Sequence, residues 1–123
     1  MSKTTIIVLA DPKGGEESLG RLFNALAAVY DLKQKRLDVQ VVFQGTGTRW
    51  AGVVTQPDHP ANALYRAVED KVAGVSSACA DFFGARADTD GNGFSLLGEN
   101  AVPGTTGLPS VATYVAEGAV ITF

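Results

Sequence analysis

The chain has 123 residues, of which 46% are hydrophobic and 19% charged, and its formal net charge at pH 7 is −3. This length and composition predict one soluble globular domain over residues 1–123, large enough to bury a core. The acidic balance gives no support to a direct nucleic-acid partner, and no apolar run approaches the roughly 20 residues of a membrane-spanning helix. The single cysteine cannot form an internal disulfide, and the first apolar run is too short for a signal peptide, so we expect a cytoplasmic protein.

Strand-like and helical segments alternate in the first half of the chain. Residues 4–10 and 39–43 are rich in β-branched side chains and almost continuously apolar, as in strands buried on both faces. Between them, residues 16–36 carry apolar side chains at helical spacing, with acidic residues in the first turn and basic residues in the last. Residues 11–15 are expected to form a turn, and residues 44–50 a glycine-rich loop after the second strand.

The second half continues this alternation. The expected elements are a helix at 61–71, a strand at 72–75, a helix after Ser77, a polar turn at 88–93, a strand at 94–97, a loop at 100–107, a helix from Pro109 to Gly118 and a strand at 119–123. Such an order predicts an α/β fold with a mainly parallel sheet. Ligands and reactive groups in these folds gather at the carboxyl ends of the strands. The loops expected at that edge are 11–15, 44–50, 76–79 and 98–107.

Cys79 is the strongest candidate for a reactive group, because it follows Ser76 and Ser77 at the end of the third expected strand. Serine is a favoured helix N-cap, and if Ser77 caps, Cys79 is the second helical residue, near unpaired backbone N–H groups. A thiol in such a position holds more of the thiolate form that attacks or carries sulfur. Under the alternative interpretation, Cys79 is a small buried hydrophobe and is inert.

Side chains from two other loops are expected to line the same site. Lys13 follows the first strand and could help to stabilise a thiolate. Trp50 follows the glycine-rich loop and is either a lid over the site or an anchor at an interface. The loop around Lys13 lacks the spacing of a phosphate-binding loop, and Glu16 and Glu17 would repel a phosphate, so a tight turn is expected there.

Residues 88–99 match the pattern of a calcium-binding loop, with Asp88, Asp90, Asn92 and Glu99 at ligand positions. The segment that follows, residues 100–107, contains a proline and cannot supply the second helix of such a site. The same composition is typical of a surface turn, so calcium binding stays an open alternative. No other metal site is expected, since the lone histidine has no histidine or cysteine nearby, and it forms no recognisable hydrolase triad.

The sequence resembles the DsrE-like family, whose fold is named after YchN. The resemblance is carried by the opening TTIIVLADPKGGEES, by VVFQGTGT at the end of the second strand, by the cysteine within VSSACADFFGA and by the terminal EGAVITF. It implies a three-layer, flavodoxin-like (YchN-like) sandwich with a mainly parallel five-stranded sheet. It also implies assembly as a homotrimer or homohexamer.

The resemblance extends to sulfur-relay members such as TusD and DsrE, in which a cysteine in this loop accepts sulfane sulfur as a persulfide. Carried over, that role falls on Cys79 alone. We therefore predict a sulfur carrier or sulfurtransferase-like protein that needs no cofactor and exchanges sulfur with donor and acceptor proteins. Ser76 and Ser77 would cap the helix, and Lys13 and Trp50 would line the site. The alternative is a non-catalytic oligomeric module of the same fold that binds a small ligand or a protein, with an inert cysteine.

Overall fold

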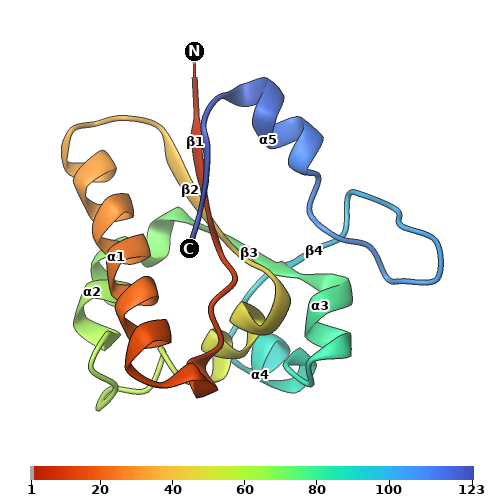
Figure 1. The fold of residues 1–123 in the computed structure, drawn as a ribbon, viewed down its shortest axis with the longest axis horizontal. Helices are drawn as coiled ribbons and strands as arrows, with labels where there is room; N and C mark the ends of the chain where they lie inside the picture. The colour runs from red at the N-terminus through yellow and green to blue at the C-terminus, as the bar shows by residue number, and fades with distance from the viewer. Residues whose placement is uncertain (1) are drawn as a thin grey trace.

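A parallel five-stranded sheet organises residues 2–123, the part of the chain that the computed structural model describes (Figure 1). Its strands run in the order β4-β3-β2-β1-β5. They are β1 (Thr4–Val8), β2 (Val39–Phe43), β3 (Val72–Ser76), β4 (Leu96–Leu97) and β5 (Val120–Thr122). All neighbouring strands are parallel, so the carboxyl ends of all five lie at the same edge of the sheet.

Helices cover the two faces of the sheet unequally. The longer connections form α1 (Gly15–Gln34), α2 (Asn62–Val68), α3 (Ser77–Phe82), α4 (Arg86–Gly91) and α5 (Val111–Glu117), with short 3₁₀ helices η1 (Pro12–Gly14), η2 (Gly45–Gly52) and η3 (Glu69–Lys71). Figure 1 shows α1 and α2 on one side of the sheet and α5 on the other. Within residues 2–123, no helix combines the length and the apolar character needed to cross a membrane.

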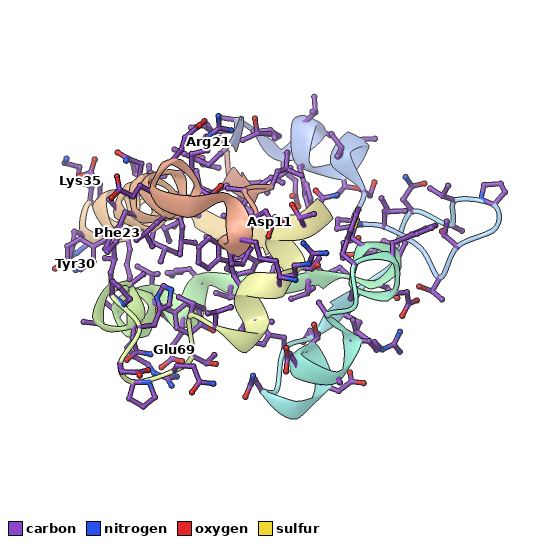
Figure 2. The ribbon with its side chains drawn as sticks, turned by 60° about the horizontal axis from the view of Figure 1, so that its bottom comes forward. Asp11, Arg21, Phe23, Tyr30, Lys35 and Glu69 are labelled. Carbon is purple, nitrogen blue, oxygen red and sulfur yellow. The ribbon has the colours of Figure 1, made fainter. Side chains whose placement is uncertain are left out.

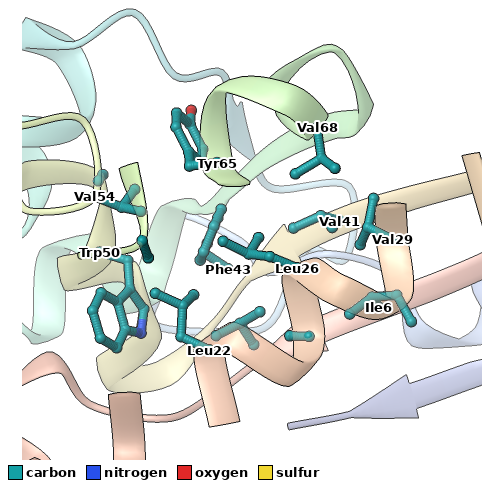
Figure 3. Packing of buried hydrophobic residues seen from close by; sticks show 14 of the residues in the cluster. Ile6, Leu22, Leu26, Val29, Val41, Phe43, Trp50, Val54, Tyr65 and Val68 are labelled. Atoms are coloured by element: carbon teal, nitrogen blue, oxygen red, sulfur yellow. The ribbon is translucent and has the colours of Figure 1, made fainter. Parts of the chain in front are cut away.

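The main core lies between the sheet and the α1–α2 layer. Ile6 and Phe43 from the sheet pack there against Leu22 and Leu26 of α1 and against Trp50 of η2 (Figure 3). All five side chains are at most 1% exposed, and burying each large apolar side chain stabilises the fold by about 1.5–3 kcal/mol. This cluster therefore supplies most of the driving force for folding.

A second, smaller core lies on the opposite face, where Tyr114 of α5 packs against Ile7 and Val42. Two further apolar residues of α5, Val111 and Val115, stay exposed. The face covered by α5 is thus only partly shielded from solvent.

The prediction of an α/β fold with a mainly parallel five-stranded sheet is confirmed, and β2 begins and ends at the expected residues. The polar turn expected at 88–93 is wrong, because residues 86–91 form α4. Thr89 is fully buried there and donates its hydroxyl to Ala85 O at 2.8 Å, while Ala85 is itself 1% exposed. The inward-facing residues of this helix are small or polar, so they leave no apolar period in the sequence.

Gly47 allows η2 to pack directly on the end of β1. A Cβ at this residue would lie 2.2 Å from Val8 O, which is backbone and cannot move aside. We expect Gly47→Ala to lower the free energy of unfolding by about 1–3 kcal/mol, the usual cost of overpacking. The matched control is Gly20→Ala inside α1, where a Cβ meets nothing within 4 Å; it should raise the free energy of unfolding by about 0.5–1 kcal/mol. Urea denaturation followed by tryptophan fluorescence measures both, and equal stabilities of the two variants would contradict the close approach.

Candidate functional site

Three connections meet at the carboxyl edge of the sheet. They are η1 after β1, η2 after β2 and α3 after β3, and η2 contacts both of the others. Figure 2 shows Asp11 between the start of α1 and η2, at the centre of this edge. This is the edge at which parallel α/β folds bind ligands, as the order of elements predicts.

Cys79 lies in the first turn of α3 and is partly exposed. The helix cap is Ser76 and not Ser77: the Ser76 Oγ accepts a hydrogen bond from the Cys79 backbone N–H at 3.3 Å. The expected cap is therefore wrong by one residue, and Cys79 is the third residue of the helix. The shift arises because β3 passes into α3 without a linking residue, so that the fully buried last residue of the strand also caps the helix.

Ser77 has a different role, because it joins α3 to the segment 98–107. Its Oγ lies 2.7 Å from Thr106 Oγ1, and Thr106 donates its only hydroxyl hydrogen to Asp81 Oδ2 at 2.8 Å. Ser77 must therefore be the donor to Thr106. With the bond from Ala78 N–H to Gly107 O at 2.8 Å, this chain of hydrogen bonds holds residues 106–107 against the start of α3.

A depression of about 590 Å³ opens beside α3, and Lys13 is among the residues that line it. Its lining consists of Pro12, Lys13, Arg49, Val53, Phe83, Gly84 and Asp88. Cys79 lies outside this lining, four residues before Phe83, which is the C-cap of α3. The Phe83 N–H donates to Cys79 O at 2.9 Å, which closes that helical turn.

Arg49 of η2 connects this helix to the residue before η1 and to the end of α3. It is not among the site residues predicted from the sequence. Its Nη1 donates to Asp11 Oδ2 at 2.8 Å and its Nε to Phe83 O at 3.1 Å. The guanidinium carbon also lies 5.8 Å from the centre of the Phe83 ring, within the range of a cation–π contact. The available signal was a basic residue in a glycine-rich loop at the carboxyl edge of the sheet.

Trp50 does not line an open site. The prediction that it forms a lid over the site or an anchor at an interface is therefore wrong. It is 1% exposed and lies in the main core, with its Nε1–H donating to Ala10 O at 2.8 Å. The His59 ring packs edge-on against it at 5.8 Å between centres, and the His59 Nδ1 accepts a hydrogen bond from Ala61 N–H. Both aromatic residues are therefore structural.

The calcium-loop interpretation is also wrong. Asp88 and Asp90 lie on α4, Asp90 lies 3.5 Å from Arg86, and Asn92 donates its amide to Ala51 O. A helical backbone spreads these groups instead of converging them on an ion. Over residues 2–123 the structure contains no group of three or more His, Cys, Asp or Glu side chains that could hold a metal ion.

The domain is thus a parallel α/β sandwich with a cysteine-bearing helix at the carboxyl edge of its sheet. The chain belongs to the DsrE/DsrF-like family, whose sequence model matches residues 2–123. The fold is similar to that of the ychN protein from E. coli in its crystal structure, with a TM-score of 0.61 and 19% sequence identity over 100% of both chains. At this identity the likeness concerns the fold alone. The comparison with curated proteins finds no match.

The hydrogen bond from Thr106, together with one from Arg86, holds the pKa of the Asp81 carboxyl below its ordinary value. We expect Thr106→Val to raise this pKa, which NMR titration of the carboxyl measures. A carboxyl whose pKa is lowered in the folded state stabilises the protein at a pH above the ordinary pKa of aspartate. This stabilisation is lost as the pH falls through the lowered pKa. The stability difference between the wild type and Thr106→Val should therefore shrink at acid pH.

The control for this titration is Thr113→Val on α5, which removes a hydroxyl bonded to Ser110 and leaves Asp81 untouched. An Asp81 pKa that moves equally in both variants, or in neither, would contradict the role of Thr106.

Proposed function

We propose that this protein is a persulfide carrier, with Cys79 as the sulfur-bearing residue. The observation that supports this most is the position of the chain's single cysteine, partly exposed in the first turn of α3 at the carboxyl edge of the sheet. Membership of the DsrE/DsrF-like family, which is generally linked to sulfur relay, adds the chemical class. The proposed setting is the cytoplasm, where thiols are kept reduced.

The proposed reaction is a thiol–persulfide exchange. The Cys79 thiolate attacks the outer sulfur of a donor persulfide; a bond forms between Cys79 Sγ and that sulfur, and the bond from the outer sulfur to the donor sulfur breaks. The donor leaves as a thiolate, so no electrons are gained or lost overall and no cofactor is required. An acceptor thiolate then attacks the outer sulfur of the Cys79 persulfide, and the protein returns to its starting state.

Hydrogen bonds within the chain would hold the helical turn that carries Cys79 in place. Ser76 and the bond from Ala78 N–H to Gly107 O fix the first turn of α3, and Ser77 ties it to Thr106. The thiol is then presented from a rigid turn, which keeps the attacking sulfur in one orientation.

The test is to incubate the native protein with a small persulfide donor and to measure its mass. The expected result is a gain of one sulfur atom by the wild type and none by Cys79→Ser, with release of that sulfur when an acceptor thiol is added. Alkylation of the native protein should also be rapid, since Cys79 is partly exposed. A thiol that reacts only after denaturation, or a protein that gains no sulfur, would overturn the proposal.

The proposed partners are sulfur donor and acceptor proteins, together with further copies of this chain in a homotrimer or homohexamer. The apolar side chains of Val111, Val115 and Ile121 support self-assembly, because they are 45%, 62% and 44% exposed on α5 and β5. Large apolar residues gathered at a surface are typical of interaction sites.

Sedimentation velocity tests the assembly. The expected mass is three or six times the 12.8 kDa of one chain. Val115→Glu should shift the protein toward smaller species, because it places a charge among apolar contacts, whereas Val102→Glu in the segment 98–107 serves as a control. A wild-type protein that sediments as a monomer at all concentrations would contradict the proposal.

The alternative function, a non-catalytic binding module with an inert Cys79, is favoured by one observation. A second depression, of about 450 Å³, lies between α3 and the segment 98–107. It is lined by Ala78, Asp81, Phe82, Gly104, Thr105 and Thr106, and the Phe82 ring is 73% exposed at its rim. The persulfide experiment separates the two functions, since only the carrier gains sulfur.

A further inference from the structure

The depression between η1, η2 and the end of α3 carries charges of both signs that do not pair with one another. Lys13 and Asp88 both line it, and both are exposed. Among the described residues, neither side chain takes part in an ion pair. One cation and one anion are therefore left facing the same open volume.

The other two charges of this edge neutralise each other. Both oxygens of Asp11 are occupied: Oδ1 accepts from the Lys13 backbone N–H at 2.9 Å and Oδ2 from Arg49 at 2.8 Å. Asp11 thus fixes the backbone of Lys13 and pairs with Arg49, and in the described part of the chain it forms no ion pair with the Lys13 ammonium group. The guanidinium of Arg49 has five N–H donors, of which two are used, one by Asp11 Oδ2 and one by Phe83 O.

The remaining lining is apolar. Pro12, Val53 and Phe83 line the depression beside the charged residues. A volume of about 590 Å³ falls within the range of small-molecule sites, which are commonly lined by apolar side chains with a few placed polar groups. The depression thus suits a small molecule with a short apolar body and one group of each charge.

We propose that this depression binds a free amino acid with a sulfur-containing side chain. The carboxylate of the ligand lies at Lys13 and the unused donors of Arg49, its ammonium group lies at Asp88, and its side chain lies on Phe83. Glu16 and Glu17, which would repel a doubly charged phosphate, are not among the residues that line the depression. Phe83 is the C-cap of α3, and its backbone N–H donates to Cys79 O at 2.9 Å, so the backbones of the two residues are one turn apart. The ligand's sulfur would then lie at the C-terminal end of the short helix that carries the thiol.

This inference deepens the proposed function, on which its chemical part rests, by naming an amino-acid persulfide as a sulfur donor that can take the place of a donor protein. The Cys79 thiolate takes the outer sulfur, and the amino acid leaves as its thiolate. The binding part does not require any reaction at Cys79.

The experiment titrates S-methylcysteine, which has both charged groups and no transferable sulfur, into the wild-type and Cys79→Ser proteins by calorimetry and NMR. Saturable binding of equal strength is expected in both. Methylthiopropionate and methylthioethylamine, which each keep one of the two charges, should bind about fivefold more weakly or worse, as the loss of one partly exposed ion pair predicts.

The variants Lys13→Gln and Asp88→Asn should each weaken S-methylcysteine binding by about fivefold. The matched control is Lys35→Gln, since Lys35 pairs with Asp31 at the far end of α1. All three positions are exposed, so the variants should fold, and thermal unfolding checks this. An absence of saturable binding, wild-type affinity in Lys13→Gln and Asp88→Asn, or equal binding of the single-charge analogues would overturn the amino-acid site.

The two proposals fail separately. Gain of sulfur at Cys79 without S-methylcysteine binding removes the amino-acid site and leaves the carrier function. Binding that depends on Lys13 and Asp88 without any gain of sulfur leaves the site and removes the carrier function.

Discussion

The buried indole of Trp50 holds together the edge of the sheet on which the site is built. Its Nε1–H donates to Ala10 O, which joins η2 to the chain just after β1. Gly47, also in η2, makes this approach possible because only a residue without Cβ fits against Val8 O. With Trp50 directed into the core, the neighbouring Arg49 is directed outward to Asp11 and Phe83. One buried ring thus determines where the charged groups of the edge can lie.

The cysteine helix is held from both ends. At its start, Ser76 belongs to the sheet and to the helix at once, and Ser77 bonds to Thr106 of the segment 98–107. At its end, Phe83 O accepts from Arg49. A helix of six residues has little stability of its own, so these contacts with distant segments maintain it. Residues of α3 and its C-cap line two depressions, one with Phe83 and one with Ala78, Asp81 and Phe82, and Cys79 itself is partly exposed between these residues in the sequence.

The two faces of the sheet differ in how completely they are covered. One face is sealed by α1, which has 20 residues, together with α2. The other face is shielded by α5, which has seven residues, mainly through Tyr114. Covering such a face with another chain removes apolar area from water, and this gain opposes the entropy that association costs. The carboxyl edge of the sheet and the thinly covered face are different parts of the surface, so the proposed assembly and the proposed sulfur exchange need not compete.

The sequence alone determined the elements whose signals are local. The apolar runs of β1 and β2, the helical period of α1 and the place of Cys79 after β3 follow from residue patterns within each segment, and the structure agrees with them closely. The tertiary structure decided the burial of Trp50, the helical state of α4 and the contacts of Arg49. Each of these depends on partners far apart in the chain: Trp50 and Ala10 are separated by 40 residues, and Arg49 and Phe83 by 34. The spacing of apolar residues within a segment predicts its secondary structure. Which side chains become buried, and against what, depends on how distant segments pack.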